Sequence, residues 1–327
     1  MKRLFTAMIT AFLLVGFSQT AQADPLPSWN ASDRKVRIVS FVEDVTDPAS
    51  QNYVTPSDRI AVFDNDGTLW GEQPVYFQVI FAIDRLKEMA KADPSVLSSD
   101  VLKAAATGDM EVVMAAGVEG LLEIINVTHS GLSVDEFIAI VQQWMTTARH
   151  PETGLLYSQM TYQPMVELLS YLRDEGFATY IVSGGGIHFI RAFAEDAYGI
   201  PSEQVIGSAA KSSYRVVDGV PTVVKEPGIA FVDDKEGKPV GIDTMIGKRP
   251  IIAGGNSDGD FQMLEWATAG DGPRLGLIVH HTDGEREVAY DRDSHIGKLV
   301  RGLDEGPDRG WVIVDMKQDW SRVYTGE

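Results

Sequence analysis

The chain has 327 residues, a formal net charge of −19 and no cysteine. This acidity argues against nucleic acid or an anionic membrane surface as a partner. Without cysteine, the chain cannot form disulfides, carry a lipoprotein anchor or use a thiol nucleophile. A site for an anion must therefore create its own positive field from a metal ion, a lysine or helix N-termini.

The N-terminal residues predict an export signal. Residues 1–3 (Met-Lys-Arg) are basic, residues 4–17 are largely apolar, and residues 21–23 (Ala-Gln-Ala) form a small-x-small cleavage pattern. The apolar part is too short to span a bilayer. We therefore expect residues 1–23 to be a signal peptide. The mature protein would begin at Asp24, in the periplasm or outside the cell, with no membrane contact after the signal is removed.

The most informative stretch follows residues 60–63, a short apolar run typical of a strand. Asp64 and Asp66 come directly after it, at the carboxyl end of the predicted strand, where open α/β sheets bind ligands. Two carboxylates this close repel each other unless a cation or a shared proton lies between them. The stretch therefore predicts a metal site, an acid/base pair or both, with a solvated Asx-rich turn as the alternative. An EF-hand calcium loop is excluded because its positions six and twelve hold Leu69 and Val75 rather than Gly and Glu.

The next part of the chain has a helical pattern with no clear strand. Apolar residues recur at helical spacing, and Ser133 with Glu136 three residues later is typical of a capping box. We expect residues 74–154 to be a helical cap inserted into a core made of residues 24–73 and 155–327.

After the insertion, strand-like and helical segments alternate. The predicted strands are 179–182, 205–206, 251–253, 275–279 and 312–314. Residues 214–217 and 220–224 flank Asp218 and Gly219, a two-residue hairpin signal. Alternating strands and helices predict an α/β fold, a Rossmann-like doubly wound parallel sheet covered on both faces.

A second predicted strand ends at Ser183, which is followed by three glycines and a helix. The Gly-x-Ser-x-Gly elbow of serine hydrolases is missing. A hydroxyl with backbone N–H groups at a helix start can bind an anion, so Ser183, Gly184 and Gly185 are candidate substrate-binding residues. A glycine-rich turn with a plain helix cap is the alternative.

A third predicted strand is followed by Asn256, Asp258 and Asp260. These side chains could simply cap the next helix. Together with the two acids of the first loop, they supply the hard oxygen ligands that Mg²⁺ prefers. All carboxyl ends of a parallel sheet lie at one edge, so the three loops can converge.

These residues resemble the haloacid dehalogenase superfamily, in its phosphoserine-phosphatase-like branch with a helical cap. The run from Asp64 to Thr68 matches the first motif of that family, and Ser183 matches the second. Lys238 is our choice for the third motif, a lysine, with Lys248 and Lys235 as rivals. Residues 255–260 resemble the fourth motif, in which Asn256 stands where the family usually has Asp.

The resemblance implies an exported, Mg²⁺-dependent phosphatase that hydrolyses a small phosphomonoester through an aspartyl-phosphate. Asp64 would be the nucleophile and Asp66 the general acid and base, while Ser183 and Lys238 would neutralise the phosphoryl oxygens. The implied Mg²⁺ ligands are Asp64, Asp66, Asn256 and Asp260, with Asp258 as an alternative. Two other functions stay open: a phosphotransferase on the same scaffold, and a catalytically degenerate exported binding protein, which only the amide at position 256 favours.

Residues near these motifs have weaker claims. Trp70, Glu72 and Tyr76 could face the substrate, but the favoured expectation is that the two aromatic residues pack between cap and core and that Glu72 is a solvated acid. His280 and His281 follow a predicted strand at the same sheet edge, where they could line the pocket or, less plausibly, bind a second metal. The natural substrate and the oligomeric state do not follow from the sequence.

Overall fold

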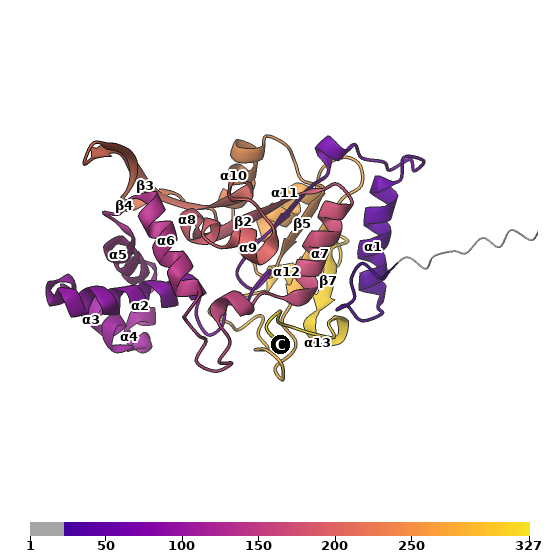
Figure 1. The fold of residues 1–327 in the computed structure, drawn as a ribbon. Coiled ribbons are helices and arrows are strands. Elements are labelled where there is room, and N and C mark those ends of the chain that lie inside the picture. The colour runs from indigo at the N-terminus through magenta and orange to yellow at the C-terminus, as the bar shows by residue number, and fades with distance from the viewer. Residues whose placement is uncertain (1–22) are drawn as a thin grey trace, which may run out of the picture.

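A computed structural model describes residues 23–327, so the predicted signal peptide lies outside the described residues except for its last position. Seven strands form one sheet in the order β4-β3-β2-β1-β5-β6-β7 (Figure 1). Their bounds are β1 (Ile60–Phe63), β2 (Ala178–Gly186), β3 (Val205–Val217), β4 (Val220–Phe231), β5 (Ile252–Gly255), β6 (Leu275–His280) and β7 (Val312–Asp315). All neighbours pair in parallel except β3 and β4. The predicted Rossmann-like α/β fold is confirmed.

Helices cover both faces of this sheet, which explains why every residue of β1 is apolar. Ala61 and Phe63 face one cluster, which includes residues of α1 (Asp33–Thr46) and α7 (Gln163–Asp174). Ile60 and Val62 alternate to the other face. That face packs on helices α10 (Gly237–Ile246) and α11 (Phe261–Thr268). Three short helices complete the core: α8 (Ile187–Arg191), α9 (Ala194–Tyr198) and α12 (Arg301–Glu305).

Of the helices between β1 and β2, α2 to α6 gather at the left of Figure 1, beside the sheet. They are α2 (Phe77–Ala92), α3 (Asp100–Thr107), α4 (Met110–Ala115), α5 (Gly117–His129) and α6 (Val134–Met145). Helices α2 to α5 share a small apolar cluster of their own. The predicted capping box at α6 is confirmed: Ser133 and Glu136 bond each other's backbone N–H.

The hairpin of β3 and β4 turns at Asp218 and Gly219, as predicted, but its strands are much longer than the sequence indicated. Its outer part is mostly exposed, so it lacks the continuous apolar run that identifies a buried strand. Strand β4 also contacts the insertion. The Lys225 N–H donates to the carbonyl of Leu132, and the Gly131 N–H donates to the carbonyl of Lys225. The hairpin therefore joins the core to the inserted helices.

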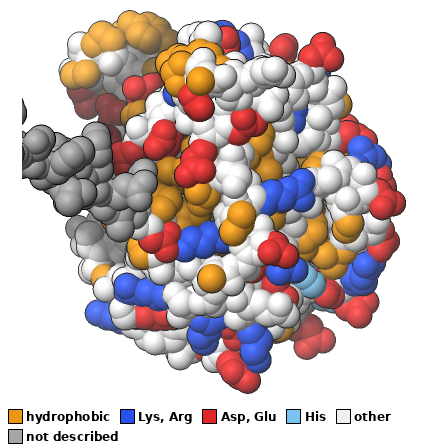
Figure 2. Space-filling model, turned by 90° about the vertical axis from the view of Figure 1, so that its right-hand side faces the viewer, with side chains coloured by type: hydrophobic (Ala, Val, Ile, Leu, Met, Phe, Trp, Pro, Cys, Tyr) orange, Lys and Arg blue, Asp and Glu red, His pale blue; other side chains and the backbone are white. Residues whose placement is uncertain are grey.

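The chain closes with β7 and the short helix α13 (Met316–Asp319). Within residues 23–327, no helix combines the length and apolarity that crossing a bilayer requires. On the face shown in Figure 2, acidic and basic side chains are interspersed, with hydrophobic side chains between them.

Candidate active site

The three predicted loops meet at one edge of the sheet. Strand β1 lies between β2 and β5, and Phe63 pairs with Ile181 on one side and Gly254 on the other. The loops that follow these strands therefore emerge side by side. They line a cavity of about 310 Å³ together with α2, α5 and α10. Its polar lining residues are Asp64, Asp66, Glu72, Tyr76, Gln78, Ser183, Asp234, Lys238, Ser257 and Asp260.

Lys238 is the central cation of this cavity. It lies in the first turn of α10 and is only 2% exposed. Its Nζ donates to Asp64 Oδ1 at 2.7 Å, to Asp260 Oδ1 at 2.6 Å and to the carbonyl of Val182 at 2.8 Å. Burial alone would lower the pKa of Lys238, but the Asp260 and Asp64 carboxylates outweigh it and raise that pKa. The ammonium group thus stays charged.

The two rival lysines lie elsewhere. Lys248 pairs with Asp58 at the surface, with both side chains about half exposed. Lys235 donates its backbone N–H to the carbonyl of Gly259 and does not line the cavity. Of the three candidates, only Lys238 reaches Asp64.

The carboxyl groups of the first loop are buried. Burial, with the nearby Asp260, raises the pKa of Asp64 well above its usual range. Burial also raises the pKa of Asp66 to about 6, and the hydrogen bond from Trp70 Nε1 to Asp66 Oδ1, at 2.8 Å, limits this rise. Trp70 itself is fully buried and stacks on Phe193, so its expected packing role is combined with a contact to Asp66.

Ser183 and the glycines after it border the same cavity. Strand β2 continues through them, with an irregularity in its pairing to β3 after Ser183. The Gly185 N–H donates to Ser183 Oγ at 3.1 Å, and a Cβ at Gly185 would lie 3.5 Å from Asp66 Oδ2. The Gly186 N–H donates to Gln78 Oε1 of the insertion at 2.7 Å. A Cβ at Gly186 would lie 2.7 Å from Gln78 Nε2, so glycine at this position lets the backbone approach Gln78.

The acidic residues of the fourth motif have different hydrogen-bond partners. Asp260 holds Lys238 with Oδ1 and accepts the N–H groups of Asn256 and Ser257 with Oδ2, both at 3.0 Å. Asp258 instead accepts N–H groups at the start of α12, among them that of Gly302. It therefore faces away from the cavity. Asn256 is buried just behind the lining residues.

Glu72 is a lining residue that had only a weak claim from the sequence. The expectation of a solvated acid is wrong, because its side chain is 2% exposed and lines the cavity. Its Oε1 accepts from Asn256 Nδ2 and from the Tyr290 hydroxyl, both at 2.7 Å. Burial raises its pKa well above the usual range. Within residues 23–327 its Oε2 has no hydrogen-bond partner, which leaves that oxygen for a ligand.

His280, the last residue of β6, and His281, which follows it, do not line this cavity. His280 pairs with Asp291 at 3.2 Å. His281 is buried, with Nε2 at 2.7 Å from the carbonyl of Gly67, and its ring stacks on Tyr290. His281 thus supports the first loop and the hydrogen-bond partner of Glu72 from behind.

The lining residues suit a divalent cation. Five carboxylates and one ammonium group line the cavity, so a buried excess of negative charge needs compensation. Carboxylate and amide oxygens are hard ligands of the kind that Mg²⁺ prefers. Residues 23–327 hold no preformed group of three His, Cys, Asp or Glu side chains arranged for a metal. A metal would therefore depend on a mixed set that includes backbone or amide oxygens.

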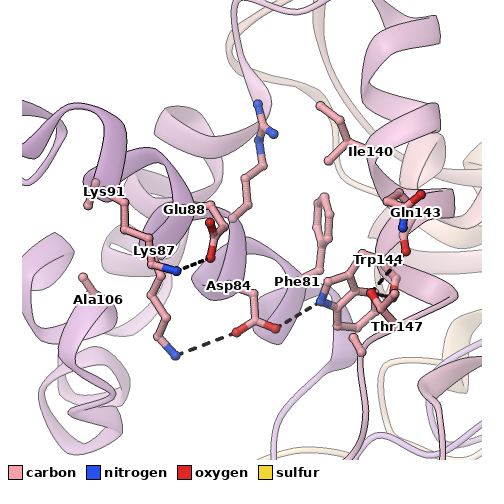
Figure 3. Close-up of a pocket in the computed structure, with 13 residues that line it drawn as sticks. Phe81, Asp84, Lys87, Glu88, Lys91, Ala106, Ile140, Gln143, Trp144 and Thr147 are labelled. Atoms are coloured by element: carbon pink, nitrogen blue, oxygen red, sulfur yellow. Dashed lines mark hydrogen bonds and ion pairs between the residues drawn. The ribbon is translucent and has the colours of Figure 1, made fainter.

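A larger hollow of about 810 Å³ lies on the outer side of the insertion, between α2 and α6 (Figure 3). Its charged side chains are engaged with neighbours: Asp84 accepts from Trp144 Nε1 at 3.1 Å and lies 3.8 Å from Lys87 Nζ. None of the strand-end loops contributes to it. We therefore assign no chemistry to this hollow.

Comparison with known proteins agrees with this geometry. Residues 61–265 match the family model of the haloacid dehalogenase-like hydrolases. This match covers more than half of the chain, so the protein belongs to that family. No curated protein sequence matches the chain significantly.

Solved structures are similar to the chain at low sequence identity. A conserved functionally unknown protein from Anaerococcus prevotii DSM 20548 has a TM-score of 0.53 and 18% identity, over 79% of this chain and 88% of its own. A protein of unknown function from Bordetella pertussis Tohama I has a TM-score of 0.47 and 19% identity, over 79% and 98%. A phosphoserine phosphohydrolase-like protein from Francisella tularensis subsp. tularensis SCHU S4 has a TM-score of 0.41 and 18% identity, over 76% and 98%.

Proposed function

We propose that the protein is a Mg²⁺-dependent phosphatase that hydrolyses a small phosphomonoester through an aspartyl-phosphate on Asp64. The observation that carries this proposal is the contact between Asp64 and Lys238, in a cavity that also holds Asp66 and Ser183. Membership of the haloacid dehalogenase-like hydrolases supports hydrolysis in general. The phosphatase class follows from the second carboxylate, since Asp66 can serve a leaving oxygen as a proton donor.

In the first step an oxygen of Asp64 forms a bond to phosphorus, while the bond between phosphorus and the leaving oxygen breaks. Lys238 holds Oδ1 of Asp64, so Oδ2, which has no partner within the described residues, is the attacking atom. Asp66 donates its proton to the leaving oxygen. In the second step Asp66 takes a proton from water, the water oxygen bonds to phosphorus, and the Asp64–phosphorus bond breaks.

The surrounding groups stabilise the phosphoryl oxygens. Ser183 and the Gly184 N–H would donate hydrogen bonds, the Gly185 N–H would hold the Ser183 hydroxyl in place, and Lys238 would supply positive charge. A side-chain pKa of about 6 lets Asp66 alternate between acid and base close to neutral pH.

Mg²⁺ would be held by the Asp64 carboxylate, the Asp66 carbonyl and the fourth motif through Asn256. Both oxygens of Asp260 are already engaged, so its direct contact with the metal stays a prediction. Glu72 adds a carboxylate next to the Asn256 amide. When bound, the ion would neutralise negative charge on the transferring phosphoryl group.

The test is hydrolysis of a chromogenic aryl phosphate with Mg²⁺. Asp64→Asn should abolish phosphate release, because the amide cannot act as the nucleophile. Asp58→Asn, a change at an exposed acid of the same region, is the matched control and should keep wild-type turnover. More than a trace of turnover by pure Asp64→Asn protein would refute the nucleophile.

The same assay separates the alternatives. Transfer of phosphate to an added alcohol would identify a phosphotransferase, and the absence of turnover by the wild-type protein would favour a binding protein. We also propose export. N-terminal sequencing of the secreted or periplasmic protein should then find Asp24 as its first residue, and an intact N-terminus would contradict this.

A further inference from the structure

A second chamber adjoins the catalytic cavity. Its volume is about 330 Å³, and it lies between α5, the start of α6, α8 and the β3–β4 hairpin. Four lining residues are common to the two spaces: Gln78, Ile125, Gly184 and Val232. The two spaces are therefore neighbouring parts of one site, and together they have the size of a pocket for a small organic molecule.

The two chambers have opposite electrostatic character. Five carboxylates line the catalytic cavity, whereas no acidic residue from the described range 23–327 lines the second chamber. Apolar side chains form most of the second chamber's wall, among them Leu122, Phe137 and Ile229. Its one charged lining residue is Lys225, which is contributed by β4.

Lys225 is a buried cation without an anionic partner. Lys225 is only 4% exposed, and no carboxylate within residues 23–327 forms an ion pair with it. Its Nζ lies 3.2 Å from His188 Nδ1 and 4.5 Å above the ring of Phe137. Burying an ammonium group without an anionic partner costs free energy. A ligand with a negative group next to Lys225 would supply the missing partner.

The neighbouring histidines do not share this charge. Burial lowers the pKa of His188 to about 4 and that of His129 to about 3, so both rings are neutral near pH 7. Burial also lowers the pKa of Lys225, to about 8, which still leaves it mostly protonated at that pH. The wall of the second chamber therefore offers a positive charge, and no carboxylate among its described lining residues, to a negative group at the far end of the substrate.

We propose that the second chamber binds the leaving group of the substrate, and that this group has an apolar body ending in an anionic group that pairs with Lys225. This inference rests on the proposed phosphatase function. If the phosphoryl group binds in the first cavity, the wall that the two spaces share places the leaving group in the second chamber. Gln78 stands at the boundary, with Oε1 accepting from the Gly186 N–H and Nε2 3.3 Å from His129 Nε2.

The test compares substrates that differ only in the terminal charge. Phosphate monoesters of ω-hydroxyalkanoic acids, in a series of chain lengths, are each paired with the methyl ester of the same acid. The wild-type protein should prefer the free acid by at least about 10-fold in kcat/KM at one or more lengths, the usual scale for a buried charge-assisted contact. Bisphosphates of α,ω-alkanediols, compared with the monophosphates, show whether a second phosphate satisfies the same subsite.

Lys225→Met should lower kcat/KM for the free acid by about 10- to 100-fold and leave the methyl esters and phenyl phosphate within about 3-fold of wild type. Lys211→Met, a change at an exposed lysine on the same hairpin, is the control and should keep the preference. Lys225→Arg should retain part of it. Turnover of phenyl phosphate by each variant shows that its catalytic site is folded.

The possible failures are distinguishable. If wild-type protein hydrolyses phenyl phosphate but treats acids and esters alike, the anion subsite is refuted and the phosphatase function stands. An equal loss of acid and ester turnover in Lys225→Met would also refute the subsite, because it would make Lys225 a structural residue only. If wild-type protein hydrolyses none of these esters, the proposed function fails and the inference fails with it.

Discussion

Replacing Lys238 by Met removes the one ammonium group that faces the buried carboxylates of the site. Asp64 and Asp260 are 7% and 1% exposed, and each accepts a hydrogen bond of 2.7 Å or less from Lys238. Removing one partner of such a buried pair leaves uncompensated charge and typically destabilises a protein by about 3–5 kcal/mol. We expect a loss of that size in the free energy of unfolding at pH 7 without added metal.

The matched control is Lys248→Met, which breaks the half-exposed pair with Asp58 and should cost less than about 1 kcal/mol. Urea unfolding, followed by tryptophan fluorescence, measures both losses. The pH dependence has a definite sign. Burial already raises the pKa of Asp64 in the wild-type protein, and Lys238 opposes that rise. Loss of Lys238 should raise this pKa further, so the deficit should be smaller at low pH, where Asp64 is protonated with or without Lys238. Equal losses in the two variants, or a Lys238→Met loss that does not depend on pH, would refute the reasoning.

Three other predictions concern the same edge of the sheet. Asp66→Ala should slow turnover of an aryl phosphate by at least ~10²-fold, the usual scale for a general acid, and a near-normal rate would remove Asp66 from the mechanism. A chelator should silence the enzyme and Mg²⁺ should restore it, whereas full activity in excess chelator would contradict a metal. Asp233 is buried, neither carboxyl oxygen has a partner within residues 23–327, and burial raises its pKa to about 7. Wild-type stability should therefore fall between about pH 4 and pH 7, and Asp233→Asn should flatten that fall and gain up to about 4 kcal/mol above pH 7; an unchanged pH profile would disprove this.

The sequence predicted the core of the fold because its strands are short, fully buried and apolar. Residues 60–63 show this pattern, and the motif after them marks the end of a strand at the sheet edge. The length of the β3–β4 hairpin could not be predicted in the same way. Most of its outer half is exposed, so its side chains alternate without an apolar run, and the contacts with Leu132 and Gly131 that help to hold it come from a distant part of the chain.

The candidate site was predictable where chemistry lies directly after the apolar run of a strand, as at Asp64 and at Ser183, although β2 itself continues to Gly186. Glu72 was not, because nothing in its immediate sequence shows that Asn256 and Tyr290 bury its carboxylate. Lys225 lies far from every motif and enters the site only through the pairing of β4 with the inserted helices. Contacts between distant segments leave no local pattern of the kind that caps, turns and strand ends leave.

Glu72 and Asn256 are best understood as one unit. In the family that the chain resembles, a carboxylate usually stands at the position of Asn256, and the amide supplies less charge to a cation. Glu72 Oε1 lies 2.7 Å from Asn256 Nδ2, so the carboxyl group that position 256 lacks is present on the neighbouring side chain. Two glycines with positive φ make this approach possible: a Cβ at Gly67 would collide with both side chains, and a Cβ at Gly297 would collide with Glu72. An aspartate at position 256 would instead place two buried carboxylates in contact, which costs more than the pairing of amide and acid; the amide at 256 is therefore the residue type that a buried Glu72 requires.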